Sequence, residues 1–319
     1  RAAGAVVPIL AVKLAVVTVN YGSARYVLDM LAALVPELDA LEDATAWIVD
    51  NRSPDDSVAV LRAALAERGY GDRVRLLESP VNGGFGAGNN VGIRAALALD
   101  PPPDAFYLLN PDARPTPGTV RAFVEFLAGH PEAGVAGGPL YSPDGSLQCA
   151  AFRFPTLLGE LESCARLGVL TRLLREHRVS MEPTTTPCAV DWVSGANLVV
   201  RRDVLERVGT FDEGFFLYFE EVDLCRRVRE AGYGVWYVPE AGVVHLHGVT
   251  TGMGSPHRRL PRYWFESRRR CYRKAYGAAG ALAMDAAALG GTALHRVAER
   301  VKRRAPDPPH FIGDLLRYR

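Results

Sequence analysis

The first half of the chain alternates short β-branched runs with helical patterns, and this alternation restricts the fold more than any other feature. The order strand, polar loop, helix is typical of an α/β fold with a mostly parallel sheet covered by helices. A helix after the second strand is expected to begin at the capping residue Ser53 and to end near Gly69. The strands that the pattern predicts are Leu14–Asn20, Ala46–Asp50, Val74–Leu77, Phe106–Leu109 and Val135–Ala136.

The polar loops after these strands are the expected ligand-binding region, because ligands of such sheets bind beyond the carboxyl ends of the strands. The loops at Asn20–Ser23, Asp50–Asp55 and Asn110–Ala113 should therefore converge on one crevice. The short side chains of Asp50 and Asn51 can pair with the edge of a nucleobase or with a ribose. Taken alone, that pair is more commonly explained by an Asx turn that caps the next helix.

A glycine-rich segment, Asn82–Asn90, follows the third predicted strand and leads into a helix that is expected to start near Asn90. Such a segment brings backbone N–H groups close to phosphate or ribose oxygens. Its glycines do not satisfy the GxGxxG pattern in any register, since Gly84 and Gly86 are followed by Asn89. The segment therefore favours a phosphate- or ribose-binding role and disfavours a nicotinamide-dependent dehydrogenase.

The fourth predicted strand leads to an exposed carboxylate, Asp112, in the sequence Asn110-Pro111-Asp112. An acid at a strand end can bind a divalent cation shared with a diphosphate, because Mg²⁺ and Mn²⁺ prefer oxygen ligands and keep open positions for substrate oxygens. A turn is the commoner explanation of these three residues alone. Their place at the same sheet edge as the two preceding loops makes the metal and nucleotide interpretation much stronger.

The segment Thr210–Arg227 is expected to carry the chemistry. Four aromatic residues precede three carboxylates, Glu220, Glu221 and Asp223, at the start of a predicted helix. On an isolated helix such acids would simply complement the helix dipole or pair with an arginine three or four positions further on. The rings, however, are typical of a pocket wall, where burial raises the basicity of a carboxylate.

The rest of the second half is less regular. Two histidines on one face of a strand suit a metal, although an isolated pair is more often used in packing or capping. The elements that the pattern predicts are a hairpin turn at Tyr141–Ser146, an amphipathic helix at Leu157–Leu174, a variable connection at Pro183–Pro187, a strand pair within Val190–Val200, a helix at Asp203–Val208, a helix stop at Gly232, a strand at Val235–Val238, and a strand with His245 and His247.

Charge and composition restrict the partners. The chain of 319 residues has a formal charge of only +1, but Lys and Arg crowd the stretch from His257 to Arg304. A local anionic partner is therefore expected rather than nucleic acid. For the basic run Arg268–Lys274 a solvated helix face is the default, and contact with phosphate or an anionic membrane is about equally favoured. Five scattered cysteines indicate neither a disulfide framework nor a zinc site.

Neither apolar stretch of the sequence is expected to cross a membrane. Residues 2–19 are interrupted by Pro8 and Lys13, and Ala278–Leu294 is mostly Ala and Gly with Asp285 inside. No secretory signal is evident in a sequence whose first residue is Arg rather than Met. The protein is expected in the cytoplasm, with peripheral contact to the inner face of the membrane through its basic C-terminal helices.

Taken together, these motifs resemble the inverting family 2 glycosyltransferases with the GT-A fold, and within them the rhamnosyltransferase-like members. The resemblance spans roughly Leu14 to Gly277 and is specific as a set. The residues that carry it are Val17–Tyr21, Val49–Asn51, Asn82–Phe85, Asn89–Gly92, Asn110–Asp112, Trp192–Ala196, Phe211–Glu213, Tyr218–Leu224 and His245.

The resemblance implies transfer of a sugar, with inversion, from a nucleotide diphosphate donor to a hydroxyl of a glycan or polyprenyl-linked acceptor in cell-surface polysaccharide assembly. It favours dTDP-rhamnose as the donor, with UDP-hexoses or UDP-N-acetylhexosamines as alternatives, and implies Mg²⁺ or Mn²⁺ as cofactor. The chain departs from the family at Glu220-Glu221, where Glu-Asp is usual, and at Asn110-Pro111-Asp112, which has one aspartate where the family has two.

The resemblance also implies roles for individual residues. Glu221 is expected to be the general base and Glu220 to contact acceptor hydroxyls. Asp223 is expected to hold the helix through Arg226 or Arg227. The expected nucleotide-sugar-binding residues are Thr18, Asn20, Tyr21, Asp50, Asn51, Gly84, Phe85, Asn89, Asn90 and Asn110. The expected acceptor-binding residues are Trp192, Ser194, Gly195 and Tyr218, the phosphate-binding residues Arg269 and Arg273, and the metal ligands Asp112 and His245.

Two other functional classes fit the sequence less well. A nucleotidyltransferase would carry its signature loop, with a basic residue, directly after the first strand, and Asn20–Ser23 has no such residue. A non-catalytic glycan-binding protein on the same fold would not need all three acids together with Asp112. The predicted division of the chain is a nucleotide-sugar-binding half at 1–140, an acceptor-binding and catalytic half at 141–258, and a basic helical extension at 259–319. A homodimer is left open.

Overall fold

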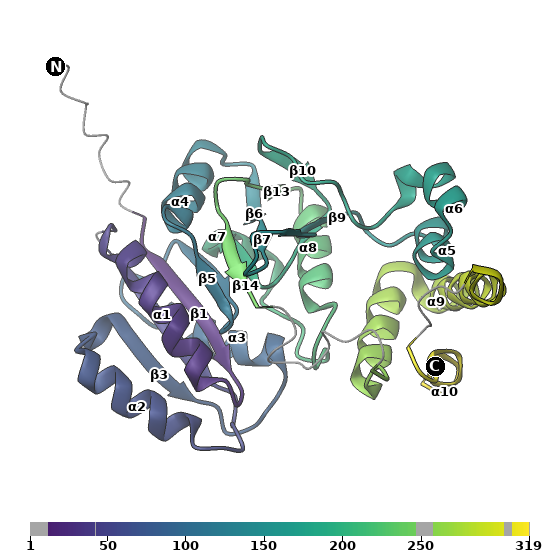
Figure 1. Ribbon diagram of the computed structural model, residues 1–319. Helices are drawn as coiled ribbons and strands as arrows, with labels where there is room; N and C mark the ends of the chain where they lie inside the picture. The colour runs from purple at the N-terminus through teal and green to yellow at the C-terminus, as the bar shows by residue number, and fades with distance from the viewer. Residues whose placement is uncertain (1–11, 42, 247–257, 303–307, 319) are drawn as a thin grey trace.

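The computed structural model describes residues 12–41, 43–246, 258–302 and 308–318. Its centre is an eight-stranded mixed sheet in the order β10-β13-β6-β12-β4-β1-β2-β3 (Figure 1). Four strands form a second sheet, β5-β14-β7-β8, and β11 pairs with β9. The strands are β1 (Leu14–Asn20), β2 (Ala44–Asp50), β3 (Val74–Glu78), β4 (Ala105–Leu109), β5 (Ala113–Pro115), β6 (Ala133–Gly137), β7 (Leu140–Tyr141), β8 (Leu147–Gln148), β9 (Ala151–Phe152), β10 (Cys188–Val190), β11 (Trp192–Val193), β12 (Asn197–Arg201), β13 (Gly234–Tyr237) and β14 (Val243–His245).

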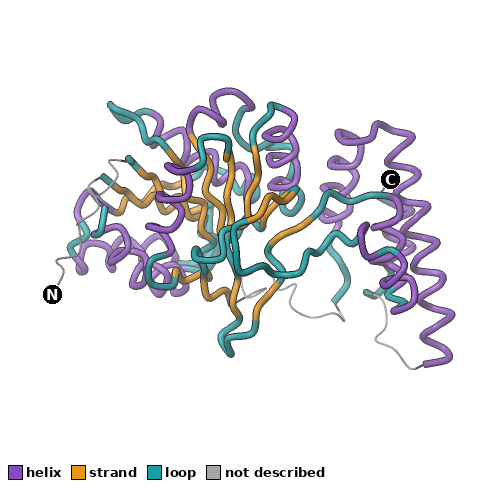
Figure 2. Tube along the Cα trace, turned by 90° about the horizontal axis from the view of Figure 1, so that it is seen from above, coloured by secondary structure: helices purple, strands orange, loops and turns teal. Residues whose placement is uncertain are grey.

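Helices cover the central sheet, and a group of helices from the second half of the chain stands at one side of it (Figures 1 and 2). The predicted α/β fold is therefore confirmed, and every residue of β1 and β4 is buried in its core. The helices are α1 (Ala24–Asp39), α2 (Ser57–Arg68), α3 (Phe85–Leu97), α4 (Thr119–Gly129), α5 (Leu157–Ala165), α6 (Gly168–Leu173), α7 (Arg202–Val208), α8 (Glu220–Glu230), α9 (Arg262–Lys302) and α10 (Phe311–Arg317), with 3₁₀ turns at Gly71–Arg73 and Arg175–His177.

The strand order brings loops that are distant in sequence to one edge of the sheet. β1 pairs in parallel with β2 and β4, so these three strands end at the same edge. β12 runs antiparallel to β4, with Asn197 opposite Leu109. The start of β12 therefore lies where the parallel strands end, and the Asn110 N–H donates a hydrogen bond to the Ala196 carbonyl at 3.1 Å.

The predicted start of α3 near Asn90 is wrong, because the helix begins at Phe85. The chain turns at Gly84, whose φ of 90° suits glycine, and becomes helical directly afterwards. At Gly88 and Gly92 an added Cβ atom would lie 2.7 and 2.5 Å from side chains of β1. These glycines therefore let α3 pack closely on the sheet and do not form a long loop.

The predicted start of α2 at Ser53 is also wrong, because the helix begins at Ser57. The Ser53 hydroxyl instead donates to Asp50 Oδ1 at 2.5 Å and accepts a hydrogen bond from the Asn20 side chain at 3.1 Å. It links the ends of two strands and caps no helix. The predicted end of α2 is confirmed, since Gly69 follows the helix with a left-handed φ of 64°.

The second half follows the prediction in most places. The hairpin at Tyr141–Ser146 joins β7 to β8, and α8 ends just before Gly232. The predicted helix at Leu157–Leu174 is divided into α5 and α6, because Arg166 takes a left-handed conformation after α5. Residues 183–187 carry no helix or strand. His247 lies outside the described residues.

The C-terminal extension consists of α9, which is broken at Gly277 (φ 70°, ψ −179°), and α10. The Arg262–Glu299 part of α9 is long and apolar enough to cross a membrane, with a mean hydropathy of 1.2 and 33% of its most apolar window buried. Core helices of soluble proteins meet the same criteria, so this finding by itself is weak. The division of the chain at residues 140 and 258 stays a prediction. The central sheet takes strands from both sides of residue 140, so the first two parts share one sheet.

Candidate active site

Two adjacent cavities lie along the sheet edge where the parallel strands end. The strand-end cavity, of about 380 Å³, is lined by the loops after β1 and β2 and by the start of α3. The carboxylate cavity, of about 610 Å³, is lined by β11, the start of α8 and the end of β14. Phe85, Asn110 and Leu217 line both cavities, so a bound molecule can extend from one into the other.

The strand-end cavity collects the more exposed of the predicted nucleotide-binding residues. The Asn51 side chain donates to Asn82 Oδ1 and to the Gly84 carbonyl, at 2.9 and 3.0 Å, and so ties the end of β2 to the glycine-rich segment. The ring of Tyr21 is 45% exposed. An accessible ring beside fixed polar groups is suited to a nucleoside. The predicted residues in this wall are Tyr21, Asn51, Gly84, Phe85 and Asn110.

The other predicted nucleotide-binding residues are packed away from this wall, within the part of the chain that the structure describes. Asn20 donates to Asp50 Oδ1 at 2.8 Å, and Asn89 donates to the Phe85 carbonyl at 3.0 Å. Thr18 is fully buried on β1. These side chains hold the strand ends and the start of α3 in place, and their direct contact with a nucleotide stays a prediction.

Three residues of the strand-end cavity come from segments that sequence reasoning did not connect with it. Phe216 and Leu217 belong to the loop before α8, and Tyr263 belongs to α9. The rings of Phe216 and Tyr263 lie 5.3 Å apart. The aromatic run before the acids predicted that Phe216 lines a pocket, but packing between distant elements brings it and Tyr263 to the strand ends.

Glu220 and Glu221 begin α8 and line the carboxylate cavity. They follow Tyr218 and Phe219, which both have left-handed backbone conformations with φ of 70° and 71°. Non-glycine residues rarely take this conformation, and it persists only where the surrounding structure holds it. The sharp turn allows both carboxylates to face the same cavity.

The surroundings of Glu220 and Glu221 raise the pKa values of both carboxyl groups, and they raise that of Glu220 more. Burial, and then the charge of Glu221, raise the pKa of Glu220 well above its ordinary value. Burial raises the pKa of Glu221 to about 6, although nearby main-chain N–H groups partly offset it. One oxygen of each carboxyl group is buried without a hydrogen-bond partner among the described residues. The charge of each carboxylate disfavours ionisation of the other, and the stronger rise at Glu220 makes Glu221 the member that ionises more readily.

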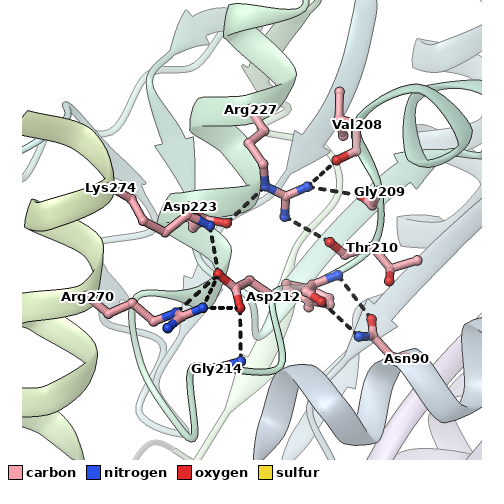
Figure 3. Close-up of polar contacts among 11 residues, drawn as sticks. Asn90, Val208, Gly209, Thr210, Asp212, Gly214, Asp223, Arg227, Arg270 and Lys274 are labelled. Carbon is pink, nitrogen blue, oxygen red and sulfur yellow. Dashed lines mark hydrogen bonds and ion pairs between the residues drawn. The ribbon is translucent and has the colours of Figure 1, made fainter.

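Asp223 faces away from this pair and is held by two cations. Its carboxylate lies 2.9 Å from Arg227 Nε and 2.6 Å from Lys274 Nζ. The same arginine donates to three successive carbonyls, at residues 208–210, which lead into the loop before α8 (Figure 3). Asp223 thus stabilises the helix and the loop that leads into it.

Asp212 fastens the middle of the same loop to α9. Its carboxylate accepts hydrogen bonds from Arg270 at 2.8 Å, from Lys274 at 2.7 Å and from the Gly214 N–H at 2.9 Å (Figure 3). Burial would raise the pKa of Asp212, but the hydrogen bonds from Arg270 and Lys274 hold it well below its ordinary value. The Asp212 carboxylate is therefore ionised throughout the physiological pH range, and its ion pairs with α9 do not depend on pH within that range.

The glycine-rich segment fastens the loop from the other side. Asn90 accepts a hydrogen bond from the Phe211 N–H at 3.0 Å and donates one to the Phe211 carbonyl at 2.9 Å. The Phe85 N–H donates to the Phe216 carbonyl at 2.9 Å, and a Cβ atom on Gly84 would lie 1.8 Å from that oxygen. The loop over residues 210–219 is therefore fixed between α3 and α9, immediately before the two glutamates.

Asp112 and His245 lie together beside the carboxylate cavity, which His245 lines. β14 pairs with β5 so that His245 is opposite Ala113, and His245 Nε2 lies 3.4 Å from Asp112 Oδ1. The prediction that Asp112 is exposed is wrong, because the strand pairing of β5 with β14 covers it and only 2% of the residue is exposed. Both of its carboxylate oxygens are buried and make no hydrogen bond to the described residues. Because an unsatisfied buried carboxylate is unfavourable, this geometry fits a divalent cation. No group of three His, Cys, Asp or Glu gathers among the described residues.

All four predicted acceptor-binding residues line the carboxylate cavity: Trp192, Ser194, Gly195 and Tyr218. The Trp192 indole stacks on Phe152 with ring centres 3.9 Å apart. Sequence reasoning missed Phe152 and Gln148, which line the same cavity, because they lie in two-residue strands that have no recognisable pattern.

The basic run Arg268–Lys274 is largely engaged with carboxylates of the protein itself. Arg268 is buried between Glu160 and Asp285, and Arg270 and Lys274 pair with Asp212. The prediction that Arg268, Arg270 and Lys274 face phosphate is therefore wrong, since carboxylates of the protein itself pair with these three side chains. The two residues predicted to bind phosphate are the half-buried Arg269 and the exposed Arg273, and their role stays a prediction.

Comparisons of sequence identify relatives of the chain. Residues 11–277 match the family model described as "Glycosyltransferase like family 2". An N-acetylglucosaminyl-diphospho-decaprenol L-rhamnosyltransferase of Mycobacterium tuberculosis is 34% identical over 254 residues, which are 75% of this chain and 78% of that protein. Rhamnosyltransferase WbbL of Escherichia coli is 27% identical over 51% of this chain and 60% of that protein.

Comparisons of structure show the fold alone. The mannosyltransferase PcManGT of Pyrobaculum calidifontis, solved with GDP-Man and Mn²⁺, superposes with a TM-score of 0.57 at 16% identity, over 93% of this chain and 78% of that one. GalNAc-T7, solved with UDP, GalNAc and Mn²⁺, superposes with a TM-score of 0.55 at 13% identity, over 94% of this chain and 59% of that one. The predicted GT-A fold is thereby confirmed.

Proposed function

Because the chain belongs to glycosyltransferase family 2, we propose that it transfers a sugar, with rhamnose favoured, from a nucleotide diphosphate donor to a hydroxyl of a lipid-linked glycan, with inversion. The observation that carries this proposal is the pair formed by the buried Glu220 and the half-buried Glu221, in a cavity that adjoins the strand-end cavity at Asn110. A UDP-hexose or UDP-N-acetylhexosamine transferase is the alternative within the family, and a non-catalytic glycan-binding protein is the alternative outside it.

In this proposal the two cavities divide the reaction. The strand-end cavity holds the nucleoside, and the acceptor sugar lies in the carboxylate cavity beside Trp192. Glu221 takes the proton of the acceptor hydroxyl as its oxygen attacks the anomeric carbon on the side opposite the leaving nucleotide diphosphate. Glu220, whose pKa burial raises well above its ordinary value, is the member of the pair better suited to keep a proton and donate a hydrogen bond to an acceptor oxygen. A single displacement of this kind inverts the anomeric configuration.

A divalent cation, Mg²⁺ or Mn²⁺, is part of the proposal. Asp112 and His245 would hold it, since the two Asp112 oxygens lack hydrogen bonds among the described residues. When bound, such a cation neutralises charge that develops on the departing diphosphate. His245 lines the carboxylate cavity, and Asn110, two residues before Asp112, lines both cavities. A diphosphate that reaches from a nucleoside in the strand-end cavity to a sugar in the carboxylate cavity would therefore pass close to this pair.

The relatives guide the choice of substrates. The name of the mycobacterial relative specifies a decaprenyl-diphosphate-linked N-acetylglucosamine acceptor and a rhamnosyl product. We propose substrates of the same chemical class here, together with a cytoplasmic location and peripheral contact with the inner face of the membrane.

We expect dTDP-rhamnose to raise the melting temperature of the protein more than UDP-hexoses or UDP-N-acetylhexosamines do, in the presence of Mn²⁺. A ligand stabilises the folded state by an amount set by its concentration relative to its Kd. Rhamnose should then appear on polyprenyl-diphosphate-linked N-acetylglucosamine with the anomeric configuration opposite to that of the donor, as measured by mass spectrometry and NMR. A larger rise in melting temperature with a UDP-sugar would favour the alternative donor. If no nucleotide sugar raised the melting temperature and no sugar were transferred to any acceptor, the glycan-binding protein would be favoured.

We expect Asp212→Asn to lower kcat about tenfold, because misplacing a reacting group by about 1 Å can cost about 10²-fold. Stability should also fall, because the hydrogen bonds from Arg270 and Lys274 that lower the pKa of Asp212 stabilise the folded state while this carboxylate is ionised. The KM for the donor should stay constant, as should the pH at which activity falls on the acid side. The matched control is Glu125→Gln, which removes an exposed ion pair with Arg121 on α4. Equal kcat values for the two variants would show that the loop before α8 needs no anchor on α9.

A further inference from the structure

A third cavity, of about 330 Å³, lies behind the start of α8, and we call it the aromatic cavity. It is enclosed by residues of α5, α8, α9 and α10 and by β11. Phe219 packs edge-on against Trp264 and Tyr272, with ring centres 5.7 and 6.2 Å away. The apolar part of its wall consists chiefly of Trp192, Phe219, Val222, Trp264, Tyr272 and Phe311.

The buried charged groups in this wall, Arg268 and Glu160, are paired with each other. Arg268 is buried and donates to Glu160 at 2.6 Å, and it pairs with Asp285 on the same helix. The Tyr272 hydroxyl donates to the other Glu160 oxygen at 2.8 Å. A ligand of this cavity would therefore find aromatic and aliphatic surface with the buried charges already paired, which suits a hydrocarbon and not a polar head group.

The aromatic cavity adjoins the carboxylate cavity. Trp192 lines both of them. Along the start of α8, Phe219 and Val222 line the aromatic cavity while Glu220 and Glu221 line the carboxylate cavity. Successive helix positions differ by about 100°, so this turn of helix presents its apolar side chains to one cavity and its acids to the other. A molecule held beside the acids can continue past Trp192 onto the apolar wall.

We propose that the aromatic cavity binds the first isoprene units of a polyprenyl chain attached, through a diphosphate, to the acceptor sugar. This inference rests on the proposed function and adds a lipid subsite to it. The cavity is near the lower end of the ~300–1,000 Å³ range of small-molecule sites, so it would hold the start of the chain and not its whole length. The rest of the chain has apolar surface available on the same helix, α9, which exposes Leu282, Leu294 and Val297.

The test compares two acceptors with the same sugar diphosphate, one on a long polyprenyl chain and one on a short, water-soluble alkyl chain. Ser163 is exposed at the edge of the aromatic cavity, so Ser163→Trp can fill the cavity without replacing a core residue. We expect this variant to lose more than tenfold in kcat/KM with the long-chain acceptor and less than twofold with the short-chain one. Ser146→Trp, on the exposed hairpin between β7 and β8, is the matched control and should lose neither. Equal losses with both acceptors, or no loss, would overturn the inference.

A binding measurement separates this inference from the proposed function. Farnesyl diphosphate should raise the melting temperature of the wild-type protein, while inorganic diphosphate should not, and Ser163→Trp should abolish the shift. The lipid subsite would be supported by this result even if no sugar were transferred, in which case only the proposed function fails. An equal shift with inorganic diphosphate would place the probe at a diphosphate site and overturn the lipid subsite.

Discussion

Glu221→Gln is expected to lower kcat by a factor of about 10² to 10⁴, because that is the usual contribution of a general base. The amide keeps the size of the side chain but cannot take a proton. Donor affinity should be close to unchanged, since Glu221 lines the carboxylate cavity and not the strand-end cavity. Thermal stability should also be close to unchanged, because the raised pKa means that ionising this buried group does not stabilise the fold.

The pH dependence of the wild-type enzyme gives a second readout of the same residue. Burial raises the pKa of Glu221 to about 6, and a general base must be ionised to act. Activity should therefore fall as the pH is lowered through about 6, and kcat/KM measured from pH 4.5 to 8 should show this acid limb. The residual activity of Glu221→Gln should lack it.

Asp223→Asn is the control for position within the cluster. Asp223 is paired with Arg227 and Lys274, so its loss should lower stability more than turnover and should leave the acid limb in place. If Glu221→Gln instead kept near-normal turnover and Asp223→Asn did not, the general base would be Asp223.

Asp112→Ala is expected to weaken donor binding by more than about 10²-fold when Mg²⁺ or Mn²⁺ is present, because even the loss of an outer partner of a metal ligand costs about 10- to 100-fold. In EDTA the variant and the wild-type protein should bind the donor almost equally. Calorimetric titration of the nucleotide sugar in both conditions measures the difference.

The metal-free Asp112→Ala protein should be at least as stable as the wild type, because both carboxylate oxygens are buried without hydrogen bonds among the described residues. A lowered melting temperature would indicate a structural role for Asp112. An equal loss of donor affinity with metal and in EDTA would rule out the metal role. His245→Ala is expected to act in the same direction with a smaller loss, since a carboxylate is the harder ligand.

The strands of the parallel half and the acids at the start of α8 can be predicted from local patterns in the chain. Buried parallel strands are short apolar runs that end in polar turns, so β1 and β4 can be recognised without any knowledge of their neighbours. The segment that contains Glu220 and Glu221 can also be recognised locally, because its aromatic residues and its acids are neighbours in the sequence.

Helix starts were less well determined, because capping residues have other uses. Ser53 has the chemistry of a helix cap, yet its hydroxyl bonds across two strand ends. The glycines after residue 82 have the chemistry of a loop, yet Gly88 and Gly92 lie inside α3, where they permit close packing on β1. In both cases a contact with a distant strand decided between two locally acceptable conformations.

Which side chains line the cavities, and which side chains hold the cavity walls in place, depends on packing between elements that are distant in the sequence. The partners of Asp212 are Arg270 and Lys274, 58 and 62 positions away, and the strand-end cavity receives Tyr263 from α9. Sequence periodicity reports which face of an element is buried, but not which element it is buried against. The basic run on α9 serves as an internal anchor because α9 packs against the loop before α8. The aromatic cavity behind α8 likewise exists because of which helices pack together.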